Sequence, residues 1–215
     1  MKRIKAIANL IRRCYCVYDI GSDHAFLSIL LLKNKIAKHV VNIENKINPL
    51  NIGKKNLQKS NLLDKTTNIR NNGLENITKK IKIKPNYIVI AGLGGWAIVK
   101  ILETCRLIKK NITFILCPNL QVHLVRKWLN ENNFSITKEQ TIFSKKFYQI
   151  IIAKQKNIKI AVKEKYLYFG QKNKQLDLPT WKKYLSFSKK MIMKNEKLLY
   201  NEQYQKMLKE IKLWK

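Results

Sequence analysis

Short apolar runs rich in β-branched residues recur along the chain, each bounded by turn residues. Seven such runs lie at positions 15–20, 39–43, 66–70, 87–91, 112–117, 135–143 and 147–154. Segments with the spacing of an amphipathic helix separate the first six runs, at positions 25–35, 49–60, 74–82, 97–109 and 123–132. Strands that alternate with helices of this length predict a parallel sheet covered by helices on both faces.

The sixth and seventh runs depart from this alternation. Only a few residues around Ser144 and Lys145 lie between them, too few for a crossover helix, so they predict an antiparallel hairpin. The expected fold class is therefore α/β, with a seven-stranded, mostly parallel sheet whose last strand is antiparallel. This arrangement resembles the Rossmann-like fold of the class I methyltransferases that use S-adenosylmethionine.

The C-terminal part of the chain has a different pattern. Residues 181–214 contain neither Gly nor Pro, and apolar residues recur every three or four positions, which predicts a helical hairpin bent near Tyr200 and Asn201. We therefore expect a larger domain at 1–160 and a helical domain at 161–215. This Lys-rich tail has two open interpretations: a nucleic-acid-binding arm, or a solvated helical pair that packs through its aromatic face.

Several classes of protein find no support in the sequence. The most apolar stretch, at 26–32, is far shorter than the roughly 20 residues of a transmembrane helix. Residues 1–13 have the pattern of a short basic amphipathic helix rather than an export signal. The four cysteines form no C-x-x-C pair, and no His lies at metal-ligand spacing from them. We expect no membrane span, no metal, reduced thiols and a cytoplasmic monomer.

Net charge points to the kind of partner. The chain carries 44 Lys and Arg against 13 Asp and Glu, a formal net charge of +31. Lys and Arg that neutralise phosphates release counterions, so this imbalance favours a nucleic acid as partner. The abundance of Lys, Ile and Asn, with only six Arg, is also what an AT-rich coding sequence produces.

The few acidic residues are unevenly placed. Only Asp19, Asp23 and Glu44 fall within the first fifty positions, and Asp19 and Glu44 each end an apolar run. In such a strand-turn-helix-strand unit the first turn holds a nucleotide-like ligand and the second acidic residue binds its ribose hydroxyls. Five of the seven glycines also follow a predicted strand: Gly21, Gly73, Gly92, Gly94 and Gly95. Glycines and carboxylates therefore mark the same edge of the sheet, the edge where such folds bind ligands.

Four motifs carry a resemblance to a known family. They are D-I-G-S-D-H-A at 19–25, I-A-G-L-G-G at 90–95, L-C-P-N at 116–119 and V-R-K-W-L at 125–129. In order and spacing the chain resembles, over about 5–170, the bacterial tRNA methyltransferases that modify N1 of adenine 22. The resemblance implies S-adenosylmethionine as cofactor, tRNA as substrate and a coiled-coil-like helical domain at the C-terminus.

Carried onto this chain, the resemblance implies three groups of site residues. The expected cofactor-binding residues are Asp19, Ile20, Gly21, Ser22, His24, Glu44, Asn45, Asn72, Gly73, Ala91, Gly92, Leu93 and Gly94. The candidate catalytic residues are Asn119, Asp23 and Trp96, with Asn119 near the adenine edge and Trp96 as a stacking platform. The candidate RNA contacts are Arg12, Arg13, Arg126 and Lys127.

Four of these residues also have ordinary structural interpretations. Asp19 can be a helix N-cap or turn residue, and His24 a satisfied residue of the first helical turn. Trp96 can be a helix-start residue packed on the sheet. Arg126 can be a surface arginine without a ligand.

The chain departs from the family pattern at two positions. Asn72 stands where relatives have the Asp that accepts a hydrogen bond from the adenine of the cofactor; its amide oxygen still accepts, more weakly. Cys117 stands where relatives have Gln. The glycine turn at 92–95 also lacks the motif with which amine-methylating members of the fold hold an exocyclic amine, which favours a ring nitrogen as the target.

Three rival functions remain open. One is a methyltransferase of the same fold acting on ribosomal RNA or a small molecule. Another is a non-catalytic RNA-binding protein on a methyltransferase scaffold, which the departures at Asn72 and Cys117 would suit. The third is a nicotinamide-dependent enzyme, against which the terminal hairpin argues.

Overall fold

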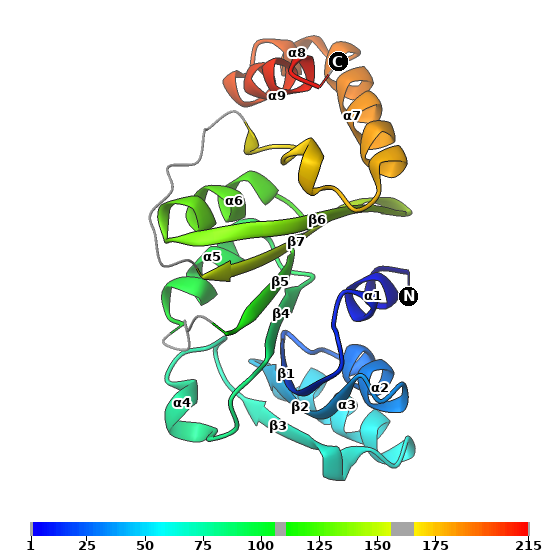
Figure 1. Cartoon of the computed structure of the whole chain (residues 1–215), viewed down its shortest axis with the longest axis vertical. Helices are drawn as coiled ribbons and strands as arrows, with labels where there is room; N and C mark the ends of the chain where they lie inside the picture. Colours follow the sequence, from blue (N-terminus) through cyan, green and yellow to red (C-terminus); the bar gives the residue numbers. More distant parts are fainter. Residues whose placement is uncertain (1, 106–110, 156–165, 215) are drawn as a thin grey trace.

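One seven-stranded sheet lies at the centre of the protein, in a computed structural model that describes residues 2–105, 111–155 and 166–214. The strand order is β3-β2-β1-β4-β5-β7-β6 (Figure 1). The strands are β1 Cys14–Ile20, β2 Ala37–Glu44, β3 Thr66–Arg70, β4 Tyr87–Ala91, β5 Thr113–Cys117, β6 Phe134–Ser144 and β7 Lys146–Gln155. Strands β1 to β5 pair in parallel, whereas β7 is antiparallel to both β5 and β6. The predicted α/β fold class and the terminal hairpin are confirmed.

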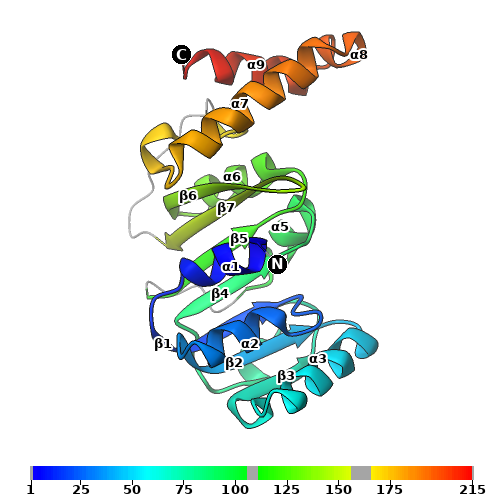
Figure 2. The ribbon, with the colours of Figure 1, turned by 90° about the vertical axis from the view of Figure 1, so that its right-hand side faces the viewer.

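Helices cover both faces of this sheet (Figures 1 and 2). One face carries α1 Lys2–Asn9, α2 Phe26–Lys33 and α3 Ile47–Lys59, and the other carries α4 Ile77–Lys80, α5 Gly95–Glu103 and α6 Val122–Glu131. Strand β1 shows the division, because Val17 packs with the α1–α3 layer while Tyr18 and Ile20 pack with the α4–α6 layer. Burial on both faces is why the strands appear in the sequence as continuous apolar runs.

Helices α4 and α5 are the ones that end or begin furthest from the predicted bounds. Helix α4 covers only Ile77–Lys80, because Asn76 before it has a left-handed φ of 49°, which interrupts a right-handed helix. Helix α5 ends at Glu103. Positions 106–109 of the predicted fourth helical segment lie outside the described residues.

The β6–β7 hairpin extends past the carboxyl end of β5. The last β5 residue paired with β7 is Leu116, opposite Ile151, whereas β7 begins at Lys146 and pairs there with Ser144 of β6. Lys145 closes the turn with a φ of 65°. The tip of the hairpin therefore stands beyond the edge at which β1, β4 and β5 end, as Figure 1 shows.

Residues 166–214 form a helical layer on β6. A short 3-10 turn, η3 Lys172–Lys174, precedes α7 Leu178–Met193, α8 Glu196–Leu199 and α9 Glu202–Lys212. Phe169, Trp181, Leu185 and Ile211 form a separate small core there. The predicted helical hairpin is confirmed; a break at Tyr200 and Asn201 separates α8 from α9, and another follows α7. The domain boundary expected at 160/161 lies outside the described residues, so the division into two domains stays a prediction.

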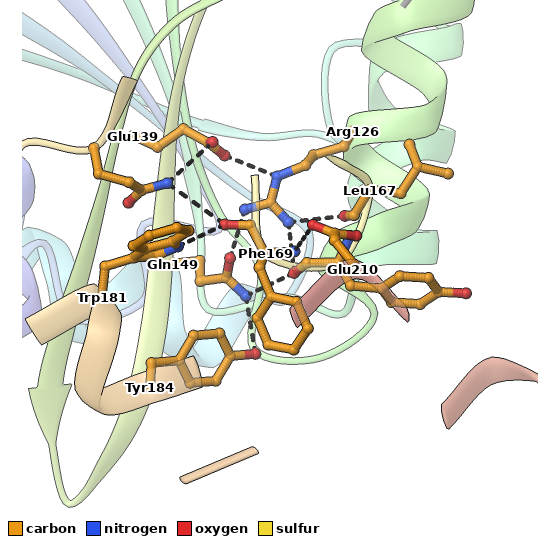
Figure 3. Close-up of polar contacts among 10 residues, drawn as sticks. Arg126, Glu139, Gln149, Leu167, Phe169, Trp181, Tyr184 and Glu210 are labelled. Atoms are coloured by element: carbon orange, nitrogen blue, oxygen red, sulfur yellow. Dashed lines mark hydrogen bonds and ion pairs between the residues drawn. The ribbon is translucent and has the colours of Figure 1, made fainter. Parts of the chain in front are cut away.

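Arg126 is the centre of the contact between this layer and the sheet (Figure 3). Its side chain is 2% exposed and its Nε donates to Glu139 Oε1 at 2.8 Å. Nη1 donates to the carbonyls of Leu167 and Tyr168 at 2.9 Å each, and Nη2 donates to Gln149. The predicted RNA contact of Arg126 is therefore wrong, because its guanidinium is buried and already bonded to protein acceptors.

Across the three described ranges, no helix has both the length and the apolar character needed to cross a bilayer. In the same ranges no three His, Cys, Asp or Glu side chains gather as a metal site. No disulfide joins the four cysteines, all of which lie in the described ranges, and three of them are buried. Burial raises the pKa of Cys16 to about 12, so this thiol stays protonated and packs as an apolar side chain.

Candidate active site

Asp19 and Glu44 lie next to each other at the carboxyl ends of β1 and β2. The two residues are only 6% and 8% exposed. Glu44 accepts hydrogen bonds from two backbone amides, that of Lys46 at 3.0 Å and that of Asp23 at 3.4 Å. Removal from water, with a contribution from the negative charge of Glu44, raises the pKa of Asp19 to about 7. The site therefore holds negative charge that a cationic ligand would stabilise.

The turn after β1 is held rigidly by backbone contacts. Gly21 has a φ of 71°, a conformation that only glycine adopts without strain, and its amide donates to Ile43 O at 2.8 Å. The Ala25 amide then donates to Ser22 O at 2.8 Å. Helix α3 packs so closely that a Cβ at Gly53 would lie 3.0 Å from the carbonyl oxygen of Asp23. The first turn is thus fixed in shape before any ligand binds.

His24 has local partners. Its ring stacks on Phe26 with centroids 5.5 Å apart, and Nε2 lies 3.2 Å from Asp23 Oδ1. Its carbonyl accepts from Asn56 of α3 at 3.1 Å. These contacts fit the structural interpretation of His24 as an organising residue of the turn, and its contact with the cofactor stays a prediction.

A cavity of about 90 Å³ lies between this turn and α1. Asp19, Gly21 and Asp23 line it on the sheet side, while Arg3 and Ile7 line it from α1. The predicted site residues Ser22 and Ala91 line it too. The side chain of Ile20, by contrast, belongs to the α4–α6 core, which leaves only its backbone at the site.

The turn after β3 is organised by a residue that the sequence did not single out. The buried Asn71 donates to the carbonyls of Gly73 and Glu75 at 3.0 Å each and accepts from Lys80 at 2.6 Å. This places Asn72 at the exposed tip of the turn, on the carboxyl side of the sheet. Asn45, the residue after β2, is exposed on the same side.

The turns after β4 and β5 are joined by hydrogen bonds. The Asn119 amide donates to Leu93 O at 2.8 Å, and the Asn119 side-chain Nδ2 donates to Gly92 O. Gly92 has a φ of 89°. The backbone of Gln121 lies so close to α5 that no Cβ fits at Gly95. Asn119 is therefore held at the rim, where the structure brings it together with the Gly92 turn.

Arg3 is a site residue that sequence reasoning missed. Its Nη1 donates to Asn119 Oδ1 at 2.9 Å, and its guanidinium carbon lies 5.1 Å from the centroid of the Tyr148 ring. A Cβ at Gly92 would lie 3.3 Å from Arg3 Nη2. No motif links Arg3 to residues more than a hundred positions away, so only the fold reveals this contact.

Two further predictions concern Trp96 and Cys117. Trp96 is 57% exposed at the start of α5, so its interpretation as a residue packed on the sheet is wrong; Lys100 Nζ lies 3.7 Å from its ring centroid. The Cys117 thiol is buried in the core beneath α1, and only its carbonyl faces the turn, where it accepts from the Gly92 amide at 3.1 Å. The departure at Cys117 therefore changes core packing rather than the lining of the site.

The remaining candidate RNA contacts lie away from the site. Arg12 and Arg13 are exposed just before β1, at the opposite edge of the sheet. Lys127 is exposed on α6, with Nζ 3.9 Å from Glu131 Oε1. Gly94, the last of the predicted cofactor residues, is the N-cap of α5 with an ordinary φ of −70°.

Comparisons with known proteins agree with this geometry. A family model described as a methyltransferase domain matches residues 1–151. The chain is 31% identical over 157 residues to the tRNA (adenine(22)-N(1))-methyltransferase of Bacillus subtilis (71% of this chain, 63% of that protein). It is also 31% identical to a putative tRNA methyltransferase of Mycoplasma pneumoniae (71% and 70%). The match thus spans somewhat less than two thirds of the B. subtilis protein.

A solved structure extends the likeness over the whole chain. The structure of M. capricolum TrmK in complex with S-adenosyl-homocysteine is 27% identical, covers 100% of this chain and 96% of that one, and superposes with a TM-score of 0.81. The likeness therefore includes the helical layer after β7 as well as the sheet. This chain belongs to the family of Rossmann-like methyltransferases that contains the bacterial tRNA (adenine(22)-N(1))-methyltransferases.

Proposed function

We propose that this chain transfers a methyl group from S-adenosylmethionine to N1 of adenine 22 in tRNA. The observation that carries the proposal is the buried carboxylate pair Asp19 and Glu44 at the glycine-lined edge of the sheet. A sulfonium cofactor with two ribose hydroxyls matches that pair in charge and in hydrogen-bonding capacity. The B. subtilis relative bears this activity in its name.

Different residues of this chain hold different parts of the cofactor. Glu44 accepts from the ribose hydroxyls, the role of the acidic residue after the second strand in such folds. Asp19 ionises beside the bound cation, which favours its charged form. Asn72 and Gly73 approach the adenine end, and Gly92 to Gly94 give the backbone close access. When bound, the cofactor supplies an electrophilic methyl group.

Asn119 is suited to recognise the target adenine. Its Oδ1 already accepts from Arg3 and its Nδ2 donates to Gly92 O, which leaves one N–H and one lone pair on a fixed amide. An Asn amide pairs in a bidentate manner with N6 and N7 of adenine. This contact leaves N1 of the base available, and Trp96 offers a ring face on which the unpaired base stacks.

The chain needs no general base for this reaction. N1 of neutral adenine already carries an in-plane lone pair, so no proton has to be removed before transfer. Positioning by Asn119 and Trp96 is then the main contribution, and well-oriented reactions gain about 7 to 11 kcal/mol from it. Asp23, whose carboxylate is 67% exposed beside the cavity, favours the positive charge of the methylated base.

A strongly cationic body suits the tRNA substrate. The net charge of +31 gives sequence-independent affinity for phosphates, to which Arg12, Arg13 and Lys127 contribute as exposed cations. We place the protein in the cytoplasm as a monomer, with residues 161–215 as a helical domain that contacts the tRNA. Each of these assignments rests on the proposed substrate.

The test is to incubate the protein with an unmodified tRNA transcript and labelled cofactor, and then to map the modified nucleotide. N1-methyladenine blocks Watson–Crick pairing, so primer extension should stop at adenine 22. Label on ribosomal RNA but not on tRNA would instead support the rival RNA substrate. Calorimetry that shows no cofactor binding by folded protein would support a non-catalytic RNA-binding protein.

A further inference from the structure

A second hollow opens beside Asn119, and it is separate from the cavity between α1 and the turn after β1, which we call the cofactor cavity. It has a volume of about 270 Å³ and lies between the turn after β5 and the helical layer. Pro118 and Asn119 border it at the site, Phe147 lines its middle, and Tyr184 and Met191 of α7 line its far side. We call this hollow, with the aromatic side chains described next, the hairpin–α7 groove. No residue of the cofactor cavity lines it.

Aromatic rings cluster around Phe147. Its centroid lies 4.9 Å from that of Phe143, 5.3 Å from that of Tyr184 and 5.5 Å from that of Phe187. Phe143 and Phe187 are each 55% exposed, although both are large apolar side chains. Such a cluster at the surface indicates a binding face, because single exposed apolar residues are common but contiguous patches of exposed rings are not.

The exposed charged residues next to Phe143, Phe147 and Phe187 on the hairpin and on α7 are lysines. Lys145 and Lys146 are exposed in the hairpin turn between Phe143 and Phe147. On α7, Lys183 and Lys190 lie four residues before and three after Phe187, on the same helical face. Neither the segment 140–155 nor α7 contains an acidic residue.

The acidic residue of α9 nearest in sequence to the groove is already neutralised by a lysine. Glu202, beside the groove-lining Gln203, is paired with Lys206 at 2.7 Å. Rings interleaved with lysines are the pattern by which proteins hold single-stranded nucleic acid: bases stack on the rings, and phosphates lie on the cations. The four lysines would make no favourable charge contact with an apolar protein partner.

We propose that the hairpin–α7 groove binds an unpaired nucleotide that flanks the target adenine, with its base stacked on Phe187 and Phe143 and its phosphates on the neighbouring lysines. The inference rests on the proposed function, since the groove opens at Asn119, where the target base is recognised. When the target base leaves the tRNA body to reach the cofactor, the neighbouring bases lose part of their stacking. A stacking surface next to the site compensates part of that cost.

Phe187→Leu and Phe143→Leu test the inference, because leucine keeps the side chain apolar but removes the ring. Affinity for an unmodified tRNA transcript, measured by fluorescence anisotropy, should fall about 10-fold for either variant, in the range of one lost base stack. Phe187→Trp should retain affinity. Calorimetric affinity for S-adenosyl-homocysteine should be unchanged in all three variants.

An exposed tyrosine elsewhere gives a matched control. Tyr15 lies near the amino end of β1 and is 57% exposed. Tyr15→Leu should bind tRNA as the wild type does. Lys183→Gln together with Lys190→Gln should reduce the slope of log affinity against log salt by about 1 to 2. Thermal unfolding of each variant should match the wild type.

The outcomes separate this inference from the proposed function. Wild-type methylation of adenine 22 with unaltered tRNA affinity in the Phe187→Leu and Phe143→Leu variants would overturn the groove assignment and leave the function intact. If the wild type methylates no tRNA, a 12-nucleotide single-stranded RNA becomes the probe: affinity that depends on Phe187 supports the groove, and affinity that does not overturns it. A wild-type dimer that Phe187→Leu converts to a monomer, with RNA affinity unchanged, would assign the face to a second copy of the chain and also overturn the proposal.

Discussion

Arg3 Nη1 donates a 2.9 Å hydrogen bond to Asn119 Oδ1 across 116 positions of the sequence. The contact joins α1 to the turn after β5 and fixes which end of the Asn119 amide faces Gly92. Helix α1 is therefore part of the site rather than only a cover for the sheet. The proposed recognition of adenine depends on this fixed amide.

We predict that Arg3→Ala lowers kcat for tRNA methylation by about 10-fold or more. A hydrogen bond from a charged donor contributes roughly 1.5 to 3 kcal/mol, and about 1.4 kcal/mol corresponds to a factor of ten. Steady-state kinetics on the transcript should show the loss in kcat rather than in the KM for tRNA. Lys5→Ala, which removes an exposed cation from the same helix, is the matched control. Equal kcat in the two variants would mean that Arg3 does not position Asn119.

The ionisation of Asp19 predicts a pH dependence of cofactor affinity. In the free protein the pKa of Asp19 is raised to about 7, so the carboxyl group is mostly protonated at pH 6 and mostly ionised at pH 8. A cationic ligand favours the ionised form, so binding releases a proton below the pKa, and affinity should rise with pH through 7 and then level off.

Titration calorimetry at pH 6 and pH 8 checks whether cofactor affinity rises with pH. Affinity for S-adenosylmethionine should be several-fold higher at pH 8, and at pH 6 the heat should depend on the ionisation enthalpy of the buffer. Asp19→Asn should bind weakly and lose the pH dependence. Asp64→Asn, at an exposed site in the 3-10 turn η1 Leu63–Lys65, should keep it. Affinity that falls between pH 6 and pH 8 in the wild type would contradict the assignment.

Glu44→Gln should weaken cofactor binding by roughly 10-fold to 100-fold. The variant keeps the shape and one acceptor oxygen but loses the charge that strengthens hydrogen bonds from the ribose hydroxyls, and hydrogen bonds to charged groups contribute about 1.5 to 3 kcal/mol. Glu103→Gln at the exposed end of α5 serves as the control. Cofactor affinity within twofold of the wild type in Glu44→Gln would remove the ribose assignment.

The buried arginine gives a prediction about stability. Arg126→Ala would remove the ion-pair partner of the buried Glu139 carboxylate and one donor to each of the half-buried carbonyls of Leu167 and Tyr168, and breaking a buried ion pair on one side costs about 3 to 5 kcal/mol. Denaturant unfolding should show that loss, whereas Lys127→Ala, one residue along on the exposed face, should change stability by less than about 0.5 kcal/mol.

The sheet and the cofactor edge could be predicted because they depend on local patterns. Apolar runs locate the strands; Asp19 and Glu44 fall at the carboxyl ends of β1 and β2 and Gly21 follows β1 directly, so parallel topology alone brings these residues to one edge. The burial of Arg126 could not be predicted from the residues next to it in the sequence. An amphipathic helix with Lys127 beside it looks solvated, and only the return of residues 167 and 168 over α6 buries the guanidinium.

Contacts between distant segments were missed for the same reason. Arg3 meets Asn119 because α1 lies across the sheet edge, and the hairpin–α7 groove exists because β6 and β7 run past β5 to meet α7. The sequence pattern predicted a role for Asn72 and none for Asn71, although Asn71 is the residue whose side chain holds the turn. Spacing along a sequence does not encode which side chain of a turn points inward.

The three neighbouring glycines after β4 should differ sharply in their tolerance of alanine. Gly92 has a φ of 89° and faces Arg3, so Gly92→Ala should cost about 1 to 3 kcal/mol and displace the guanidinium from Asn119. Gly95→Ala would place its Cβ against the backbone of Gln121, which forces the turn after β5 away from α5. Gly94 has an ordinary φ, and its nearest neighbour would lie 4.0 Å from an added Cβ.

Activity and thermal unfolding of the three alanine variants measure these differences directly. Gly94→Ala should unfold as the wild type does, while Gly92→Ala and Gly95→Ala should unfold at lower temperature and lose most of the methylation activity. The loss in Gly92→Ala should resemble that of Arg3→Ala, because both changes release Asn119, and combining the two should cost less activity than the sum of the single effects. Fully additive losses in the double variant would show that Gly92 and Arg3 act on the site independently.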